Sequence, residues 1–152
     1  MAKEFSFADL NKEMSKISEY GNTLDKSTIS EIDHYIPTGN YHLNACLTGS
    51  LFGGYPNNRA VALAGPSGTG KTYLILNAIK QAQKQGYSII FYDSENAVDK
   101  SLVEKFGIDA SKFRYEPCNT VQEFRSSVTA ITDVLIEQKK KGIELPKIMV
   151  VL

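Results

Sequence analysis

The spacing of apolar residues divides the chain into helical and extended segments. After Ser6, apolar side chains recur at intervals of three and four positions, which is typical of an amphipathic helix, and the pattern stops near Gly21. These side chains are Phe7, Leu10, Met14 and Ile17. Residues 22–58 have a mixed pattern with many glycines and prolines around a short possible helix at 41–47. The sequence therefore predicts an amino-terminal helix and a lead-in segment over residues 1–58.

From residue 59 to residue 152 the pattern becomes regular. Four short apolar runs alternate with stretches of helical periodicity. The expected strands are residues 59–64, 87–92, 113–116 and 147–152, and the expected helices are residues 71–85, 98–106 and 121–140. Strands that alternate with helices indicate parallel βαβ units, and runs that are apolar on both faces indicate helices on both sides of the sheet. The sequence therefore predicts an α/β fold with an open parallel sheet.

The longest expected helix has a defined start and one apolar face. Thr120 and Glu123 have the spacing of a capping box. The residues expected to face the core are Val121, Phe124, Val128, Ile131 and Leu135. Residues 139–141 are three lysines, and cations suit the negative end of a helix dipole. They therefore indicate a solvated helix terminus more than a DNA contact.

Composition narrows the class of protein. A chain of 152 residues with 42% hydrophobic and 22% charged residues is long enough for one independent core and is typical of a globular domain. Its 17 basic residues balance 17 acidic ones, so the average charge gives no indication of nucleic-acid or membrane binding. Cys46 and Cys118 lack CxxC spacing and no apolar leader precedes them, which predicts reduced thiols and a cytoplasmic location. No apolar run approaches the ~18 residues of a membrane span.

Residues 65–72 carry the strongest chemical signal. Their sequence, GPSGTGKT, fits the phosphate-loop pattern G-x-x-x-x-G-K-[ST] at every specified position. Glycine lets successive backbone N–H groups point at phosphate oxygens, while Lys71 reaches the β and γ phosphates and the Thr72 hydroxyl binds Mg²⁺. The alternative is a glycine-rich turn without a ligand. We predict that this loop binds ATP with Mg²⁺, through Gly65, Pro66, Ser67, Gly68, Thr69, Gly70, Lys71 and Thr72.

Two carboxylates follow the second expected strand directly. Ligands of open α/β sheets lie at the carboxyl ends of the strands, so Asp93 and Glu95 should lie at the edge where the phosphate loop opens. Hydrolysis of a γ-phosphate needs a group that orients or deprotonates water, and a carboxylate at this edge can do so. Spacing alone leaves open the alternative that polar residues simply end a strand in solvent. His34 and His42 have no partner at metal-ligand spacing, so nucleotide-bound Mg²⁺ is the one metal expected.

Residues 35–152 resemble the ATPase core of RecA-type recombinases, and most of all the phage UvsX-like branch. The resemblance is carried by the lead-in that begins IPTGNYH, by the phosphate loop, by FYDSENAVD at 91–99 and by FGID at 106–109. It implies that Lys71 acts in catalysis, that Glu95 activates the hydrolytic water and that Asp99 lies near the adenine. Tyr73 also falls in the nucleotide-binding stretch, where relatives often have a small hydroxyl residue. Leu102 stands where some relatives stack an aromatic ring on the adenine.

The last segment, residues 147–152, resembles the next core strand of the family. In the family an aspartate of the magnesium shell follows this strand, and the loops that grip single-stranded DNA lie beyond it. The resemblance therefore implies the amino-terminal part of a longer recombinase, within which residues 59–152 form a partial ATP-binding core. We expect ATP binding to survive better than hydrolysis in this segment, and strand exchange to be absent from it.

The leading hypothesis is the ATP-binding core of a DNA-dependent ATPase of homologous recombination and repair. By resemblance, the full-length form would coat single-stranded DNA as a homo-oligomeric filament. A ring-forming, helicase-type motor of the same superfamily and a non-catalytic ATP-binding fragment are the alternatives. A small-molecule kinase would need arginines clustered in a lid, whereas Arg59, Arg114 and Arg125 are scattered.

Overall fold

The computed structural model describes residues 5–18, 21, 23–26 and 31–152 in two compact units. The first unit lies within residues 1–33, and the second comprises residues 34–152. Among the residues so described, no helix combines the length and the apolar character that crossing a bilayer requires.

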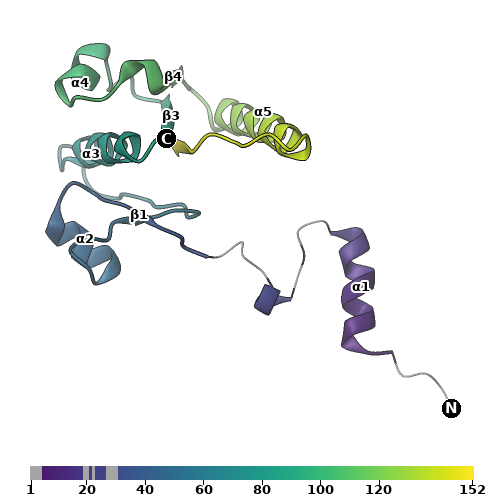
Figure 1. Cartoon of the computed structure of the whole chain (residues 1–152). Coiled ribbons are helices and arrows are strands. Elements are labelled where there is room, and N and C mark those ends of the chain that lie inside the picture. Colours follow the sequence, from purple (N-terminus) through teal and green to yellow (C-terminus); the bar gives the residue numbers. More distant parts are fainter. Residues whose placement is uncertain (1–4, 19–20, 22, 27–30) are drawn as a thin grey trace. The chain divides into compact units, whose positions relative to one another are not determined.

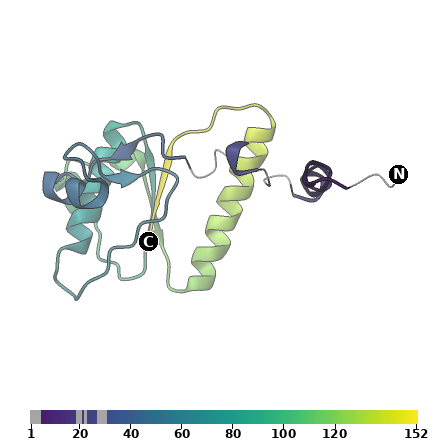
Figure 2. The ribbon, with the colours of Figure 1, turned by 90° about the horizontal axis from the view of Figure 1, so that it is seen from below.

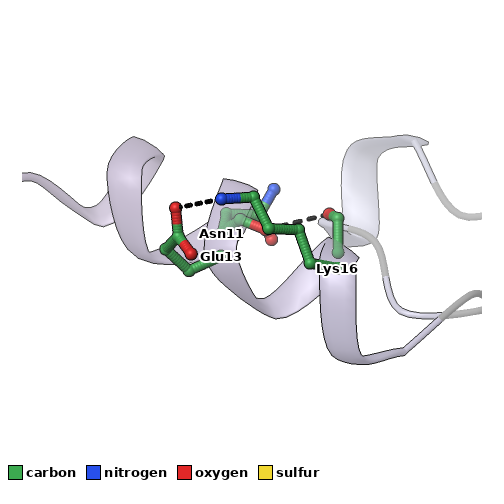
Figure 3. Close-up of polar contacts among 4 residues, drawn as sticks. Asn11, Glu13 and Lys16 are labelled. Carbon is green, nitrogen blue, oxygen red and sulfur yellow. Dashed lines mark hydrogen bonds and ion pairs between the residues drawn. The ribbon is translucent and has the colours of Figure 1, made fainter.

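The first unit contains helix α1 (Phe7–Ile17) and a short 3-10 helix, η1 (Leu24–Lys26). Ser6 begins α1 with a capping box, in which the Ser6 hydroxyl accepts a hydrogen bond from the Asp9 N–H and the Asp9 carboxylate accepts one from the Ser6 N–H, both at 3.2 Å. Figure 3 shows the ion pair between Lys16 and Glu13 on the same helix, with an N–O distance of 2.6 Å. The predicted amino-terminal helix is confirmed, although it ends at Ile17, earlier than expected.

The second unit is built on a parallel sheet of three strands in the order β4-β3-β5 (Figure 1). The strands are β3 (Ser88–Asp93), β4 (Phe113–Pro117) and β5 (Ile148–Val151). In the central strand β3, five of six residues are buried, which is the burial pattern of a strand covered on both faces. Phe91 of β3 pairs with Tyr115 of β4 and with Val151 of β5, and this register aligns the carboxyl ends of the strands.

Helices cover both faces of this sheet. They are α3 (Lys71–Lys84) and α4 (Lys100–Lys105) on one face and α5 (Val121–Lys140) on the other, and the unit also contains α2 (Tyr41–Thr48) and a 3-10 turn, η2 (Ala110–Lys112). Side chains of β3 alternate between the faces, so Ile89 packs with Ile79 of α3, whereas Tyr92 packs edge-on against Phe124 of α5. Figures 1 and 2 both show α3 and α5 on opposite sides of the sheet. The predicted α/β fold, with helices on both sides of a parallel sheet, is confirmed.

Helix α5 begins and ends as the sequence predicts. Thr120 and Glu123 exchange the two hydrogen bonds of a capping box, each 3.2 Å long. The predicted core-facing residues that pack on the sheet are Phe124, Val128 and Ile131. Leu135 is half-buried, but Val121 is 78% exposed, and the prediction that it faces the core is wrong. Val121 is the first residue of the helix and lies beyond the part that the sheet covers.

The lead-in segment forms an antiparallel pair, β1 (Tyr35–Ile36) and β2 (Tyr55–Pro56), on either side of α2. Asn40 begins α2, because its side chain accepts a hydrogen bond of 3.1 Å from the Leu43 N–H. The buried Thr38 donates to the Asn44 side chain at 2.8 Å, which ties the incoming chain to the helix. The short helix expected at 41–47 is therefore confirmed.

The strand expected at residues 59–64 does not form. These residues lie outside every helix and strand, and no ladder of hydrogen bonds joins them to β5. Residues 59–63 and 148–152 instead line a common cleft of about 690 Å³. A strand is stable only when a neighbouring edge satisfies its backbone N–H and C=O groups, and here the β5 edge is not paired with this run. An apolar run in the sequence does not encode that pairing, so this prediction was wrong.

We expect Gly54→Ala to destabilise the fold far more than Gly49→Ala. At Gly54 φ is 149°, and an added Cβ would lie 2.1 Å from the carbonyl oxygen of Ile36, in the backbone of β1. Gly49 also has a positive φ, 72°, but no atom lies within 4 Å of an added Cβ. The free energy of unfolding in urea should fall by about 3 kcal/mol for Gly54→Ala and about 1 kcal/mol for Gly49→Ala. Equal losses would contradict the close approach of Gly54 to β1.

Candidate nucleotide-binding site

The predicted phosphate loop, residues 65–72, runs directly into the first turn of α3. Gly68 and Gly70 have left-handed backbone angles, with φ of 78° and 88°, which glycine adopts without steric cost. An added Cβ at either glycine would meet no atom within 4 Å, so the space beside the loop backbone is open. Gly70 is the N-cap of α3 and offers no side chain to the first N–H groups of the helix. Uncapped N–H groups at the positive end of a helix favour an anion.

The Lys71 side chain lies across this loop. Its Nζ donates hydrogen bonds of 2.8 Å to the carbonyl oxygens of both Gly65 and Pro66. The Thr69 hydroxyl closes the same turn by donating to the Pro66 carbonyl at 2.8 Å. In the part of the chain that the structure describes, the ammonium therefore has neutral acceptors and no carboxylate partner. A phosphate oxygen is a stronger acceptor than a carbonyl oxygen and can replace it.

Two further side chains of the loop, and the tyrosine that follows it, are exposed. Ser67 and Thr72 are exposed, so both hydroxyls are accessible to a ligand. Tyr73 is 61% exposed, and its ring packs edge-on against Phe106, with ring centroids 5.3 Å apart. The structure thus brings Lys71 and the loop carbonyls together, but it places the Tyr73 ring against the end of α4.

A single carboxylate organises the turn that follows β3. Asp93 is buried, and it accepts hydrogen bonds from the N–H of Glu95 at 3.0 Å, from the N–H of Val98 at 3.1 Å and from the Tyr115 hydroxyl at 3.2 Å. Burial by itself raises the pKa of Asp93. Hydrogen bonds from the backbone amides of Val98, Glu95 and Ala97 and from Tyr115 outweigh that effect, so the pKa of Asp93 is lowered. Asp93 therefore carries its negative charge in the folded protein at neutral pH.

Glu95 differs from Asp93 in its exposure and in its hydrogen bonding. Its side chain is exposed, and only its backbone N–H is engaged, by Asp93. In the described part of the chain, no hydrogen bond or ion pair holds the Glu95 carboxylate. This carboxylate is therefore free to contact water or a ligand at the carboxyl end of β3, as the sequence predicts for its position.

Asp99 is the N-cap of α4. Its carboxylate accepts a hydrogen bond of 2.7 Å from the Leu102 N–H, which satisfies one of the free donors of the first helical turn. The structure gives Asp99 a local role that sequence reasoning did not assign. The signal for it was an aspartate just before a stretch of helical periodicity.

Sequence reasoning also missed the role of Asp93 as an acceptor of several hydrogen bonds. The signal was available in the segment DSEN, because aspartate followed by small and polar residues often bonds to the backbone two positions on. The contribution of Tyr115 carried no such signal, since that residue arrives from β4 and is 22 positions away in sequence. Only the pairing of β3 with β4 brings Tyr115 to Asp93.

This chain is similar to a known protein family and to several known proteins. Residues 3–140 match the family model of the RecA N-terminal domain. The chain is 33% identical over 127 residues to Protein RecA of Lactobacillus delbrueckii subsp. bulgaricus, which covers 81% of this chain and 38% of that relative. It is 43% identical over 74 residues to Protein RecA of Bacteroides thetaiotaomicron, which covers 49% of this chain and 22% of the relative.

A third relative, Protein RecA of Mesoplasma florum, is 40% identical over 80 residues, or 52% of this chain and 23% of that protein. The chain thus spans less than two fifths of the length of each of these curated relatives. The match to the family model, in contrast, extends over most of the chain. The predicted resemblance to RecA-type proteins is confirmed, and the chain belongs to the RecA family.

Proposed function

We propose that residues 59–152 are the ATP-binding core of a RecA-type recombinase, a DNA-dependent ATPase of homologous recombination and repair. The observation that supports this most is the loop at 65–72, where a lysine ammonium lies among neutral acceptors beside uncapped helix N–H groups. A lysine ammonium together with free N–H groups at the start of a helix suits a polyphosphate. Membership of the RecA family supports ATP as the nucleotide.

Each residue of the loop has a proposed part in holding ATP. The backbone N–H groups of Gly65 and of residues 67–70 would bind phosphate oxygens, while Pro66, which has no N–H, and Ser67 would shape the turn. Lys71 would exchange its two carbonyl acceptors for phosphate oxygens. The Thr72 hydroxyl, which is exposed, would hold Mg²⁺, and the bound ion would neutralise charge on the phosphates. Tyr73 would contact the nucleotide only at the edge of the site, since its ring packs against Phe106.

Two acidic side chains complete the proposed site. Glu95 would orient or deprotonate the attacking water, a role that its unpaired and exposed carboxylate permits. Asp99 would lie near the adenine while continuing to cap α4. In this assignment, Lys71 stabilises charge that develops on the transferred phosphate and Glu95 handles the proton of the water.

For the full-length protein we propose a filament on single-stranded DNA that carries out strand exchange in the cytoplasm of a bacterium or a phage-infected cell. The names of the matched relatives support this, and so does the resemblance to the phage UvsX-like branch, of which the chain would form the amino-terminal part. These properties are proposed for a longer protein because the chain spans only part of those relatives.

Lys71→Ala is expected to weaken binding of a fluorescent ATP analogue at least about tenfold. The change removes a charged donor to the phosphates, and such hydrogen bonds contribute roughly 1.5–3 kcal/mol. Lys84→Ala is the matched control, because Lys84 is at the opposite end of the same helix, roughly 20 Å away along its axis. The affinity of the Lys84→Ala variant for the ATP analogue should equal that of the unaltered chain. Equal affinity of the Lys71 variant and the control would rule out the phosphate loop as the binding site.

Glu95→Gln is expected to leave the affinity for ATP within about threefold of the unaltered value and to lower ATP turnover at least about a hundredfold. Glutamine has nearly the same shape but cannot accept the proton from water. Steady-state release of phosphate at saturating ATP measures the change, with Glu116→Gln on β4 as a control carboxylate. If the Glu95 variant kept full turnover while Lys71→Ala abolished it, another group would have to activate the water.

A further inference from the structure

The turn between β3 and α4 is held by one carboxylate. Asp93 is only 6% exposed, and its carboxylate accepts hydrogen bonds from the backbone amides of Glu95 and Val98 and from the Tyr115 hydroxyl. A carboxylate has about four acceptor sites, so most of those of Asp93 are occupied within the turn. Asp93 therefore holds the chain next to the proposed catalytic position.

The hydrogen bonds of Asp93 determine the path of the chain through Glu95. The Oδ1 atom accepts from the Glu95 N–H at 3.0 Å, and the Oδ2 atom accepts from the Val98 N–H at 3.1 Å. Between them, Asn96 adopts a left-handed φ of 53°, a conformation that asparagine adopts more readily than most residues other than glycine. The surrounding hydrogen bonds hold the turn in this conformation. The amides on either side of Asn96 supply that restraint by bonding to one carboxylate.

A second strand fixes the carboxylate itself. Tyr115 of β4 donates to Asp93 Oδ2 at 3.2 Å, and its hydroxyl also lies 3.4 Å from the side-chain oxygen of Asn96. The turn is thus attached to the sheet through the Tyr115 hydrogen bond from β4 as well as through its direct connection to β3. The Glu95 side chain has no such contact within the described residues, so its backbone alone sets where its carboxylate can reach.

We propose that Asp93 is a positioning residue that holds Glu95 in place at the carboxyl edge of the sheet, with Tyr115 locking Asp93 to β4. The proposal rests on the proposed function of Glu95 as the group facing the γ-phosphate. Asparagine cannot replace Asp93, because one of its two polar atoms is an NH₂ donor and would oppose a backbone N–H. The negative charge is needed as well, since it makes these hydrogen bonds to a buried acceptor stronger.

The first measurement needs no nucleotide. Amide hydrogen exchange of the ¹⁵N-labelled chain should show protected N–H groups at Glu95 and Val98. Asp93→Asn should speed their exchange at least about tenfold, while Asp109→Asn, which alters a carboxylate that caps η2, should leave them unchanged. Unchanged protection in the Asp93 variant would overturn the proposal.

The second measurement separates positioning from a merely structural role. A carboxylate held near a γ-phosphate repels it, so Glu95→Gln should raise the affinity ratio of fluorescent ATP to ADP analogues about threefold. In a chain that also carries Asp93→Asn, Glu95→Gln should have no effect on this ratio, because the Glu95 side chain is no longer held near the γ-phosphate. An equal threefold effect in both backgrounds would contradict the proposal.

Tyr115→Phe provides the milder variant, because Tyr115 is partly exposed and removing its hydroxyl leaves the buried carboxylate and the Glu95 and Val98 amides in place. It should speed exchange of the same amides about threefold and reduce the effect of Glu95→Gln in part. No change in either measurement would remove Tyr115 from the proposal.

If Lys71→Ala bound nucleotide as tightly as the unaltered chain, the proposed function would fail. The hydrogen-exchange data would still decide whether Asp93 holds the backbone of Glu95.

Discussion

The two hydrogen bonds from the Lys71 ammonium to the Gly65 and Pro66 carbonyls are the interaction on which the candidate site depends. They close the loop on itself and place a positive charge beside the uncapped first turn of α3. The loop can adopt this form because Gly68 and Gly70 accept left-handed backbone angles. The helix that carries it is rigidly seated, since Leu76 and Ile79 are almost completely buried against the sheet.

Three acidic residues between the end of β3 and the start of α4 differ in exposure and hydrogen bonding. Asp93 is buried and hydrogen-bonded, Asp99 caps α4, and of these three only Glu95 presents an unpaired carboxylate. Glu95 is therefore the one of the three whose carboxylate is open to a ligand. Asn96 adopts its left-handed conformation at this point, and the hydrogen bonds on both sides of it converge on Asp93.

The sequence predicted best those features that local interactions determine. The start of α5 followed from the spacing of Thr120 and Glu123, and the alternation of helices and strands indicated the parallel sheet. Features that depend on distant partners were not predictable. The run at 59–64 has the composition of a strand but lacks a paired edge, and the Tyr115 contact to Asp93 exists only through the register of β3 with β4. Whether the site residues bind a nucleotide remains a prediction.

The most direct test of the central claim is the amide spectrum of the ¹⁵N-labelled chain during titration with ATP and Mg²⁺, compared with titration by adenosine. Phosphate binding by the loop backbone predicts that the N–H signals of Gly65 and of residues 67–72 shift with ATP and stay in place with adenosine at the same concentration. Shifts confined to other parts of the chain, or equal shifts of the loop signals with adenosine, would contradict the assignment of this loop to phosphate.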